Sequence, residues 1–161
     1  MAKLQDYLEQ VNVFSALKEE PEWMLELRQA ALAKVDELAF PKIERVRYER
    51  WPLFNIDEQA LAGEYALSEE EVAGAVPAFD AMDNHPTLVQ FDDTTIFEQL
   101  PQELIDKGVI FTDLFTAMKE VPELVNQYYM TKAVPMDEDK MTAAHAAFMN
   151  SGMFLYCLLY T

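Results

Sequence analysis

The stretch from Gly108 to Tyr156 constrains the fold more than any other part of the chain. Two short runs of residues that favour strands, 109–111 and 153–156, stand near its two ends. Directly after the first run, Thr112 or Asp113 can cap a helical turn, because a short polar side chain accepts hydrogen bonds from free backbone amides. The order strand, helices, strand predicts mixed α and β structure, and no catalytic cluster is recognisable in it.

Two further helices are predicted inside this stretch. Pro122 suits the first position of a helix that continues over 123–130, since its missing N–H would have no partner there. Asp137 is expected to cap a second helix, which Gly152 is expected to end. The apolar face of this second helix is expected to consist of Met141, Ala144, His145, Phe148 and Met149.

Two helices are also expected near the start of the chain, one over 2–14 and one that begins at Pro21. The apolar stripe of the second is expected to consist of Met24, Leu27, Ala31, Val35 and Leu38. Arg28 and Lys34 are expected to face outward. Trp23 is expected to pack against the preceding helix, and the alternative is an exposed anchor for a partner protein.

The middle of the chain mixes short elements. Residues 42–51 alternate weakly, which favours an ion-paired edge strand or extended arm over a nucleic-acid contact. Ser68 and Glu71 form a capping-box pattern at the start of a helix, which Pro77 is expected to kink or end. The other predicted elements are a strand at 87–91, a turn at Asp92 and Asp93, and a short helix at 101–107.

A net charge of −17 is spread unevenly along the chain. Residues 55–108 contain 13 acidic side chains and 1 basic side chain, a local charge of −12. Nucleic acids and anionic membranes are therefore disfavoured as partners, because binding phosphate groups requires a basic face. No run approaches the roughly 20 apolar residues that cross a bilayer, and no secretory signal is recognisable. A single cysteine fits the reducing cytoplasm, where we expect the protein.

Few side chains suited to chemistry occur in the sequence. His85 and His145 are the only histidines and Cys157 is the only cysteine, whereas structural zinc requires four such ligands. We expect His85 to face solvent, His145 to be a hydrogen-bonded core residue rather than an acid–base group, and Cys157 to be unreactive. The three glutamates at 69–71 favour a solvated helical turn over a divalent metal site, because adjacent helical side chains point in different directions. We therefore predict no catalytic, cofactor-binding or metal-binding residues.

Several short phrases stand along the chain in a characteristic order. They are Glu-Pro-Glu-Trp at 20–23 with Arg28, Val-Arg-Tyr at 46–48 with Trp-Pro-Leu at 51–53, Gly-Val-Ile-Phe at 108–111, Pro-Glu-Leu-Val at 122–125, Ala-Ala-His-Ala-Ala-Phe at 143–148 and Gly-Met-Phe-Leu-Tyr at 152–156. In this order they resemble the SufB/SufD family of iron–sulfur cluster assembly proteins, and SufD more than SufB. The resemblance ends after Tyr156, where the family normally continues through Val-Pro-Lys into a long β-helical body. We therefore expect an N-terminal portion that is truncated there.

The resemblance implies an α+β fold in two consecutive regions. An N-terminal helical region, 1–84, is expected to precede a mixed segment, 85–161. The short strands of this second segment are expected to resemble the start of a right-handed β-helix.

The resemblance also implies a function in the SUF iron–sulfur cluster assembly system. Intact SufD joins SufB and the ATPase SufC in the cytoplasm to build clusters, so SufB- and SufC-type proteins are the expected partners. In that family the SufB contact and the cluster-related groups lie in the β-helical body, and the SufC contact lies in the C-terminal helical region. We therefore expect a non-enzymatic fragment that acts through protein–protein contacts and has no cofactor of its own, the cluster being implied only for the intact complex.

Three other expectations come from the residues themselves. The acidic stretch 55–108 favours, as an alternative, a free-standing acidic module that binds a basic partner. Residues 153–160 combine high β propensity with no charge and no proline, which predicts a homo-oligomer formed through an open edge. An enzyme ranks last, because only scattered carboxylates favour it.

Overall fold

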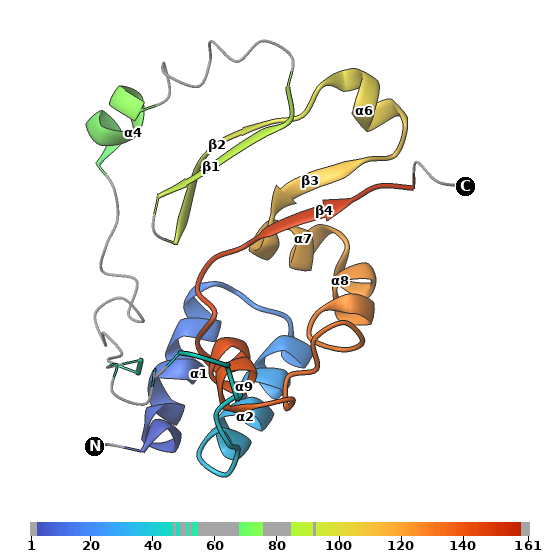
Figure 1. Ribbon diagram of the computed structural model, residues 1–161. Coiled ribbons are helices and arrows are strands. Elements are labelled where there is room, and N and C mark those ends of the chain that lie inside the picture. The colour runs from blue at the N-terminus through green and yellow to red at the C-terminus, as the bar shows by residue number, and fades with distance from the viewer. Residues whose placement is uncertain are drawn as a thin grey trace. The chain divides into compact units, whose positions relative to one another are not determined.

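The computed structural model describes residues 3–46, 48, 51, 53–54, 68–75, 85–91 and 93–158 (Figure 1). Its helices and short antiparallel strands confirm the predicted α+β class. The chain divides into two compact units, which we call the helical unit and the strand unit. The helical unit contains Met1–Glu64 and Val121–Met149, and the strand unit contains Tyr65–Glu120 and Asn150–Thr161. The boundary between 84 and 85 and the likeness to a β-helix stay predictions.

The helical unit is built from a 3-10 turn and α-helices. In its described part these are η1 (Leu4–Tyr7), α1 (Leu8–Leu17), α2 (Glu22–Val35), α8 (Pro122–Tyr128) and α9 (Lys140–Phe148). Pro122 occupies the start of α8, as predicted. Pro21 directly precedes α2, and its carbonyl oxygen accepts hydrogen bonds from the first turn. Glu22 in the first turn and Lys34 in the last turn suit the dipole of α2.

The core of the helical unit lies where α2 packs against α9 (Figure 1). Four alanines of α9, at positions 143, 144, 146 and 147, are buried there, and their small side chains allow the two helices to pack closely. The other buried members of this core are Leu4, Val11, Ala31, Leu32 and Val35. At its margin the rings of Tyr7 and Phe148 meet edge to face, with their centroids 6.0 Å apart.

The start of α9 differs from the prediction. Asp139, not Asp137, is the N-cap, and its carboxylate accepts hydrogen bonds from Met141 N at 2.7 Å and Thr142 N at 2.9 Å. The hydroxyl oxygen of Thr142 accepts a hydrogen bond from Asp139 N at 3.0 Å, which completes a capping box. Asp137 stands two residues before the cap, and its carboxylate accepts a hydrogen bond from Lys34 Nζ at 2.6 Å.

The predicted end of α9 was wrong, and its predicted apolar face was right for Ala144, Phe148 and Met149 but wrong for His145. The helix ends at Phe148, and Gly152 lies beyond it without the left-handed conformation of a capping glycine. His145 is exposed, because the buried alanines occupy the opposite side of a helix with about 3.6 residues per turn. The packed face therefore consists mainly of alanines, with Phe148 at its margin.

The strand unit contains two antiparallel pairs of strands. They are β1 (Thr87–Phe91) with β2 (Thr94–Gln99), and β3 (Ile110–Asp113) with β4 (Met153–Tyr156). The bounds of β1 and β4 agree with the prediction, whereas β2 was not predicted. Gln90 Nε2 donates a hydrogen bond to Gly152 O at 2.9 Å and so connects β1 to the segment before β4.

Short helices complete the strand unit. In its described part they are α4 (Glu69–Ala75), α6 (Gln102–Asp106) and α7 (Leu114–Glu120). Ser68 and Glu71 form the predicted capping box, with Ser68 N 2.9 Å from Glu71 Oε2. Asp113 rather than Thr112 caps α7, because its Oδ1 accepts hydrogen bonds from the backbone amides two and three residues later, both at 3.0 Å. No helix in the described ranges is long and apolar enough to span a bilayer.

The edge strand or arm expected over 42–51 does not form in the residues described there. Glu44 and Arg45 make a turn, and the φ of Arg45 is +66°, a left-handed conformation that interrupts an extended strand. The other arginines of this stretch, Arg47 and Arg50, lie outside the described residues, as does Pro77, the expected helix breaker.

Candidate functional site

The helical unit buries an arginine. Arg28 was expected to face outward, but it is only 1% exposed. The prediction was wrong because it sorted α2 by charge, whereas Arg28 stands four residues after buried Met24 and three before buried Ala31, on the inner face. Lys34 does lie at the surface, where it pairs with Asp137.

Glu20 neutralises the charge of Arg28 inside the protein. Its side chain is 0% exposed, and it accepts hydrogen bonds from Arg28 Nε at 2.8 Å and from Arg28 Nη2 at 2.5 Å. This two-point geometry is the strongest form of contact between a guanidinium and a carboxylate. It offsets the large cost of removing both charges from water.

The other hydrogen bonds of Arg28 reach the end of α9. Its Nη1 donates to Ala147 O at 3.0 Å, and its Nη2 donates to Met149 O at 2.8 Å. Carbonyl groups at the end of a helix lack amide partners within the helix and carry partial negative charge, so the guanidinium satisfies both. The ring of Phe14 in α1 lies 5.1 Å from Arg28 Cζ. This network joins α1, α2 and α9, and its contacts suit it to fixing these helices rather than to binding an anion.

Polar atoms of two aromatic side chains lie buried in the helical unit. Trp23 Nε1 and Tyr129 Oη have no hydrogen-bond partner among the described residues. Burial raises the pKa of Tyr129 to about 12, while the charge of Arg28 lowers it and the charge of Glu20 raises it. Tyr129 is therefore a neutral phenol within electrostatic reach of the ion pair. Trp23 is half-buried, so it is not the exposed anchor that was the alternative to packing.

The residues considered for chemistry stay apart. His85 is exposed, as predicted, and Cys157 is exposed after β4. His145, expected in the core, lies on the outer side of α9, and partial desolvation followed by the positive charge of Arg28 lowers its pKa. Across the described part of the chain, no three His, Cys, Asp or Glu side chains gather where they could hold a metal ion.

Glu71, in the first turn of α4, serves the helix itself. The backbone N–H and the hydroxyl of Ser68 both donate to Glu71 Oε2, which lowers the pKa of the Glu71 carboxyl. Glu70 is exposed. This arrangement agrees with the solvated first turn that the sequence predicts.

An apolar surface lies on β4 and the residues after it. Met153 is 61% exposed and Leu155 is 64% exposed, because alternate residues of a strand share one face. Leu158 is also exposed. Among the residues that the structure describes, β4 pairs only with β3, so its other edge has no strand beside it. We call Met153, Leu155 and Leu158 the β4 surface, and it is the candidate interaction site of the strand unit.

Comparison with known proteins identifies the family. A family model for the N-terminal region of SufBD proteins matches residues 2–158. The chain belongs to the SufBD family. The matched range includes the Arg28 network and β4, so both features lie within the SufBD region.

Individual members of the SufBD family show how much of a longer protein is matched. The chain is 40% identical over 154 residues to the iron–sulfur cluster assembly protein SufD of Bacillus subtilis, with 94% of this chain and 35% of that protein covered. It is 26% identical to a SufBD family protein of Staphylococcus saprophyticus and 27% identical to a chloroplastic one of Arabidopsis thaliana, of which it covers 33% and 29%. The chain thus spans about a third of the length of these relatives. No solved structure matches this chain significantly.

Proposed function

We propose that this chain is the N-terminal part of a SufD-like component of the SUF iron–sulfur cluster assembly system. We also propose that it acts in the cytoplasm through protein–protein contacts rather than by catalysis. The observation that carries this proposal is the 40% identity to an iron–sulfur cluster assembly protein SufD over 94% of the chain. The proposed partners are SufB- and SufC-type proteins. The cluster is attributed to the assembled complex, and this chain has no cofactor of its own.

The structure supports a role in contacts through one exposed surface. The β4 surface presents large apolar side chains that a partner would remove from water, which stabilises association by about 25 cal/mol per Å² of apolar area buried.

The test is retention of SUF proteins by the immobilised full chain. Purified SufB- and SufC-type proteins are passed over it at low and at high salt, singly and together. The contacts that the resemblance implies for SufB and SufC lie outside this region, so we expect retention through the β4 surface alone. It should persist at high salt, because contacts between apolar surfaces are not screened. Failure of both proteins to bind under every condition would contradict the proposal.

The proposed absence of a cofactor has a separate test. The full chain is reconstituted anaerobically with iron and sulfide and then desalted. We expect no stoichiometric iron and no charge-transfer absorption in the visible range. Stoichiometric iron with that absorption would show that the chain holds a cluster by itself.

The second candidate function is a free-standing acidic module that binds a basic partner. The observation that favours it is the charge of −12 in residues 55–108. Binding of this kind depends on exposed charges and therefore falls with ionic strength. A basic partner that is released by salt, together with no retention of SUF proteins, would favour this candidate over the first.

Self-association through 153–160 is a further part of the proposal. The open edge of β4 can pair with the same strand of a second copy, so that each strand supplies the missing hydrogen bonds of the other. The exposure of Met153, Leu155 and Leu158 supports this pairing, while Leu159 and Tyr160 lie outside the described residues.

A further inference from the structure

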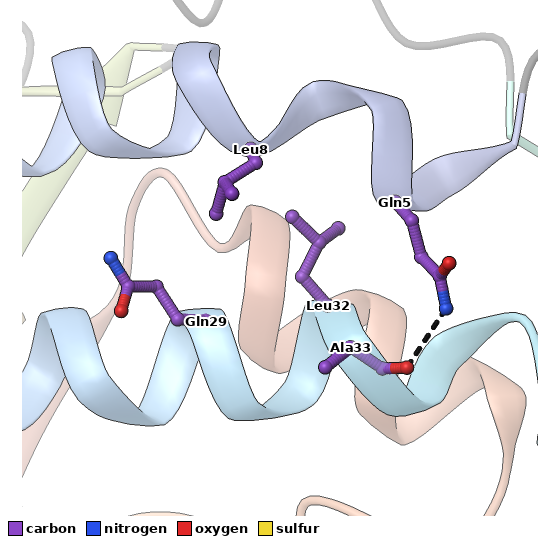
Figure 2. Close-up of a pocket in the computed structure, with 5 residues that line it drawn as sticks. All are labelled: Gln5, Leu8, Gln29, Leu32 and Ala33. Carbon is purple, nitrogen blue, oxygen red and sulfur yellow. Dashed lines mark hydrogen bonds between the residues drawn. The ribbon is translucent and has the colours of Figure 1, made fainter.

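A groove runs between η1, α1 and α2 in the helical unit (Figure 2). Its volume is about 510 Å³, and its lining consists of Gln5, Leu8, Gln29, Leu32 and Ala33. In Figure 2 the side chains of Leu8 from α1 and Leu32 from α2 point toward one another, with the two glutamines on either side of them. The groove therefore has exposed Leu8 in its middle, with buried Leu32 beneath it, and amide groups along its rim.

The rim of the groove is held in place by hydrogen bonds. Gln5 Nε2 donates to Ala33 O at 2.9 Å, and Gln29 Nε2 donates to Asn12 Oδ1 at 2.9 Å. Each bond links the first helical segments to α2 across the groove. The groove is therefore built into the helical unit, and it does not depend on the position of one loose side chain.

The size of the groove suits side chains rather than water. A water molecule takes up roughly 30 Å³ of liquid volume, so the groove is far larger than a site for one or two ordered waters. Its volume falls in the range of about 300–1,000 Å³ that is usual for ligand pockets. Leu8 is 46% exposed, so apolar surface remains for a bound group to cover.

The surroundings of the groove are acidic. Glu22 and Glu26 are exposed and stand on the same side of α2 as Gln29 and Ala33, since they precede these residues at helical spacing. Glu9 is exposed on α1. None of these three carboxylates forms an ion pair with another residue that the structure describes. A ligand for this groove would therefore meet exposed Leu8, these three carboxylates along α1 and α2, and the exposed Lys3 two residues before Gln5.

We propose that the groove binds an amphipathic helix of a partner protein, with aliphatic side chains that cover exposed Leu8 and Lys or Arg side chains that face the flanking glutamates. A groove between two helices is a common docking place for a third, and the anchors then recur at helical spacing. Opposite charge favours a basic helix. A second copy of this chain is a poor occupant, because its net charge is −17. This site is separate from the β4 surface and from residues 55–108, and it does not depend on the SUF partners.

The probe is a fluorescently labelled synthetic peptide of about 18 residues, which makes roughly five helical turns. It carries Leu at helical spacing on one side and Lys on the other. One control peptide has the same composition in an order that scatters the leucines, and another replaces every Lys by Glu. Binding to the full chain is followed by fluorescence anisotropy. We expect the patterned basic peptide to bind at least about tenfold more tightly than either control.

Variants of the chain locate the binding site. Ala33→Gln places a larger side chain in the groove and should weaken binding roughly tenfold. Ala133→Gln is the matched control, because Ala133 is exposed in the helical unit but does not line the groove, and this variant should bind the peptide unchanged. Leu8→Ala removes an exposed anchor and gives a second variant in case Ala33→Gln does not fold.

The remaining outcomes decide against the proposal. Equal binding of the patterned and scattered peptides would show that no helical face is recognised. Binding of the acidic peptide as tightly as the basic one would remove the argument from charge. Unchanged binding by both Ala33→Gln and Leu8→Ala, with circular dichroism showing native helices, would place the peptide elsewhere.

Discussion

Arg28 and Glu20 form a buried two-point ion pair, with Nε 2.8 Å from Oε2 and Nη2 2.5 Å from Oε1. The same guanidinium donates to the carbonyl oxygens of Ala147 and Met149, which lie far along the chain at the end of α9. One side chain therefore connects the start of α2 to the helix that packs against it. Its loss would leave both a charge and two carbonyl groups buried without partners.

Arg28→Ala should lower the free energy of unfolding by about 3–5 kcal/mol, because removing one member of a buried ion pair leaves the other uncompensated. Arg28→Lys should fall between this variant and the native chain, since one ammonium cannot reproduce the two-point contact with Glu20. Urea unfolding followed by circular dichroism measures the change. Lys34→Ala breaks the exposed pair with Asp137 and should have little effect. Equal losses in Arg28→Ala and Lys34→Ala would contradict the role assigned to the buried pair.

Asp139→Ala should destabilise α9 by roughly 1 kcal/mol, because two backbone amides at the start of the helix lose their acceptor. Asp137→Ala is the matched control two residues earlier, and it removes only a surface contact with Lys34. The same urea measurement on both variants separates the two aspartates. If Asp137→Ala proved the more damaging substitution, the assignment of the N-cap to Asp139 would be wrong.

Elements whose signals lie within a few neighbouring residues were predictable from the sequence. The Ser68 and Glu71 capping box, the start of α8 at Pro122, and both β1 and β4 depend on local backbone chemistry and propensity. The strand β2 carried such a signal in its β-branched and aromatic residues at 94–97, and it was overlooked. The capping box of Asp139 and Thr142 was also readable from their spacing, but three consecutive acidic residues offered competing caps.

The buried network was not predictable in the same way. Its acceptors, the carbonyl groups of Ala147 and Met149, belong to a distant segment, and the sequence does not state which helices pack together. The spacing of Arg28 from Met24 and Ala31 did place it on the inner face of α2. Charge alone favours an outward Arg28, because an unpaired arginine is rarely buried, and the sequence does not show that Glu20 is its partner.

Gly108→Ala should lower the free energy of unfolding by about 1–2 kcal/mol. Gly108 joins α6 to β3 at a φ of +79°, a left-handed conformation that disfavours a residue with a Cβ atom. Apart from its two chain neighbours, no described residue comes within 4 Å of the position that the Cβ would take, so the loss comes from the backbone and not from crowding. Gly108→Asn should be less damaging, since asparagine tolerates this conformation. Equal stability of the alanine variant and the native chain would show that the turn relaxes.

Leu155→Lys should reduce self-association, because it places a charge in the middle of the β4 surface. Multi-angle light scattering over a range of protein concentrations measures the mean mass of the native chain and the variant. Val134→Lys is the matched control, an exposed apolar residue of the helical unit that should leave the mass unchanged. A native chain that stays monomeric at high concentration, and does not change when residues 153–161 are deleted, would contradict pairing through β4.

Acidification should destabilise the helical unit partly through His145. Partial desolvation and the nearby charge of Arg28 lower the pKa of His145 in the folded chain below its ordinary value of 6.5, so the unfolded chain takes up a proton more readily. The native chain should therefore lose stability as the pH falls through 6.5 toward the lowered pKa. Above pH 6.5, His145 should cause no such loss. His145→Gln removes the titrating group, while carboxylates that titrate at lower pH affect both proteins alike. Urea unfolding of both at several pH values should give a smaller loss for the variant, whereas parallel curves would mean that His145 titrates as it does in the unfolded chain.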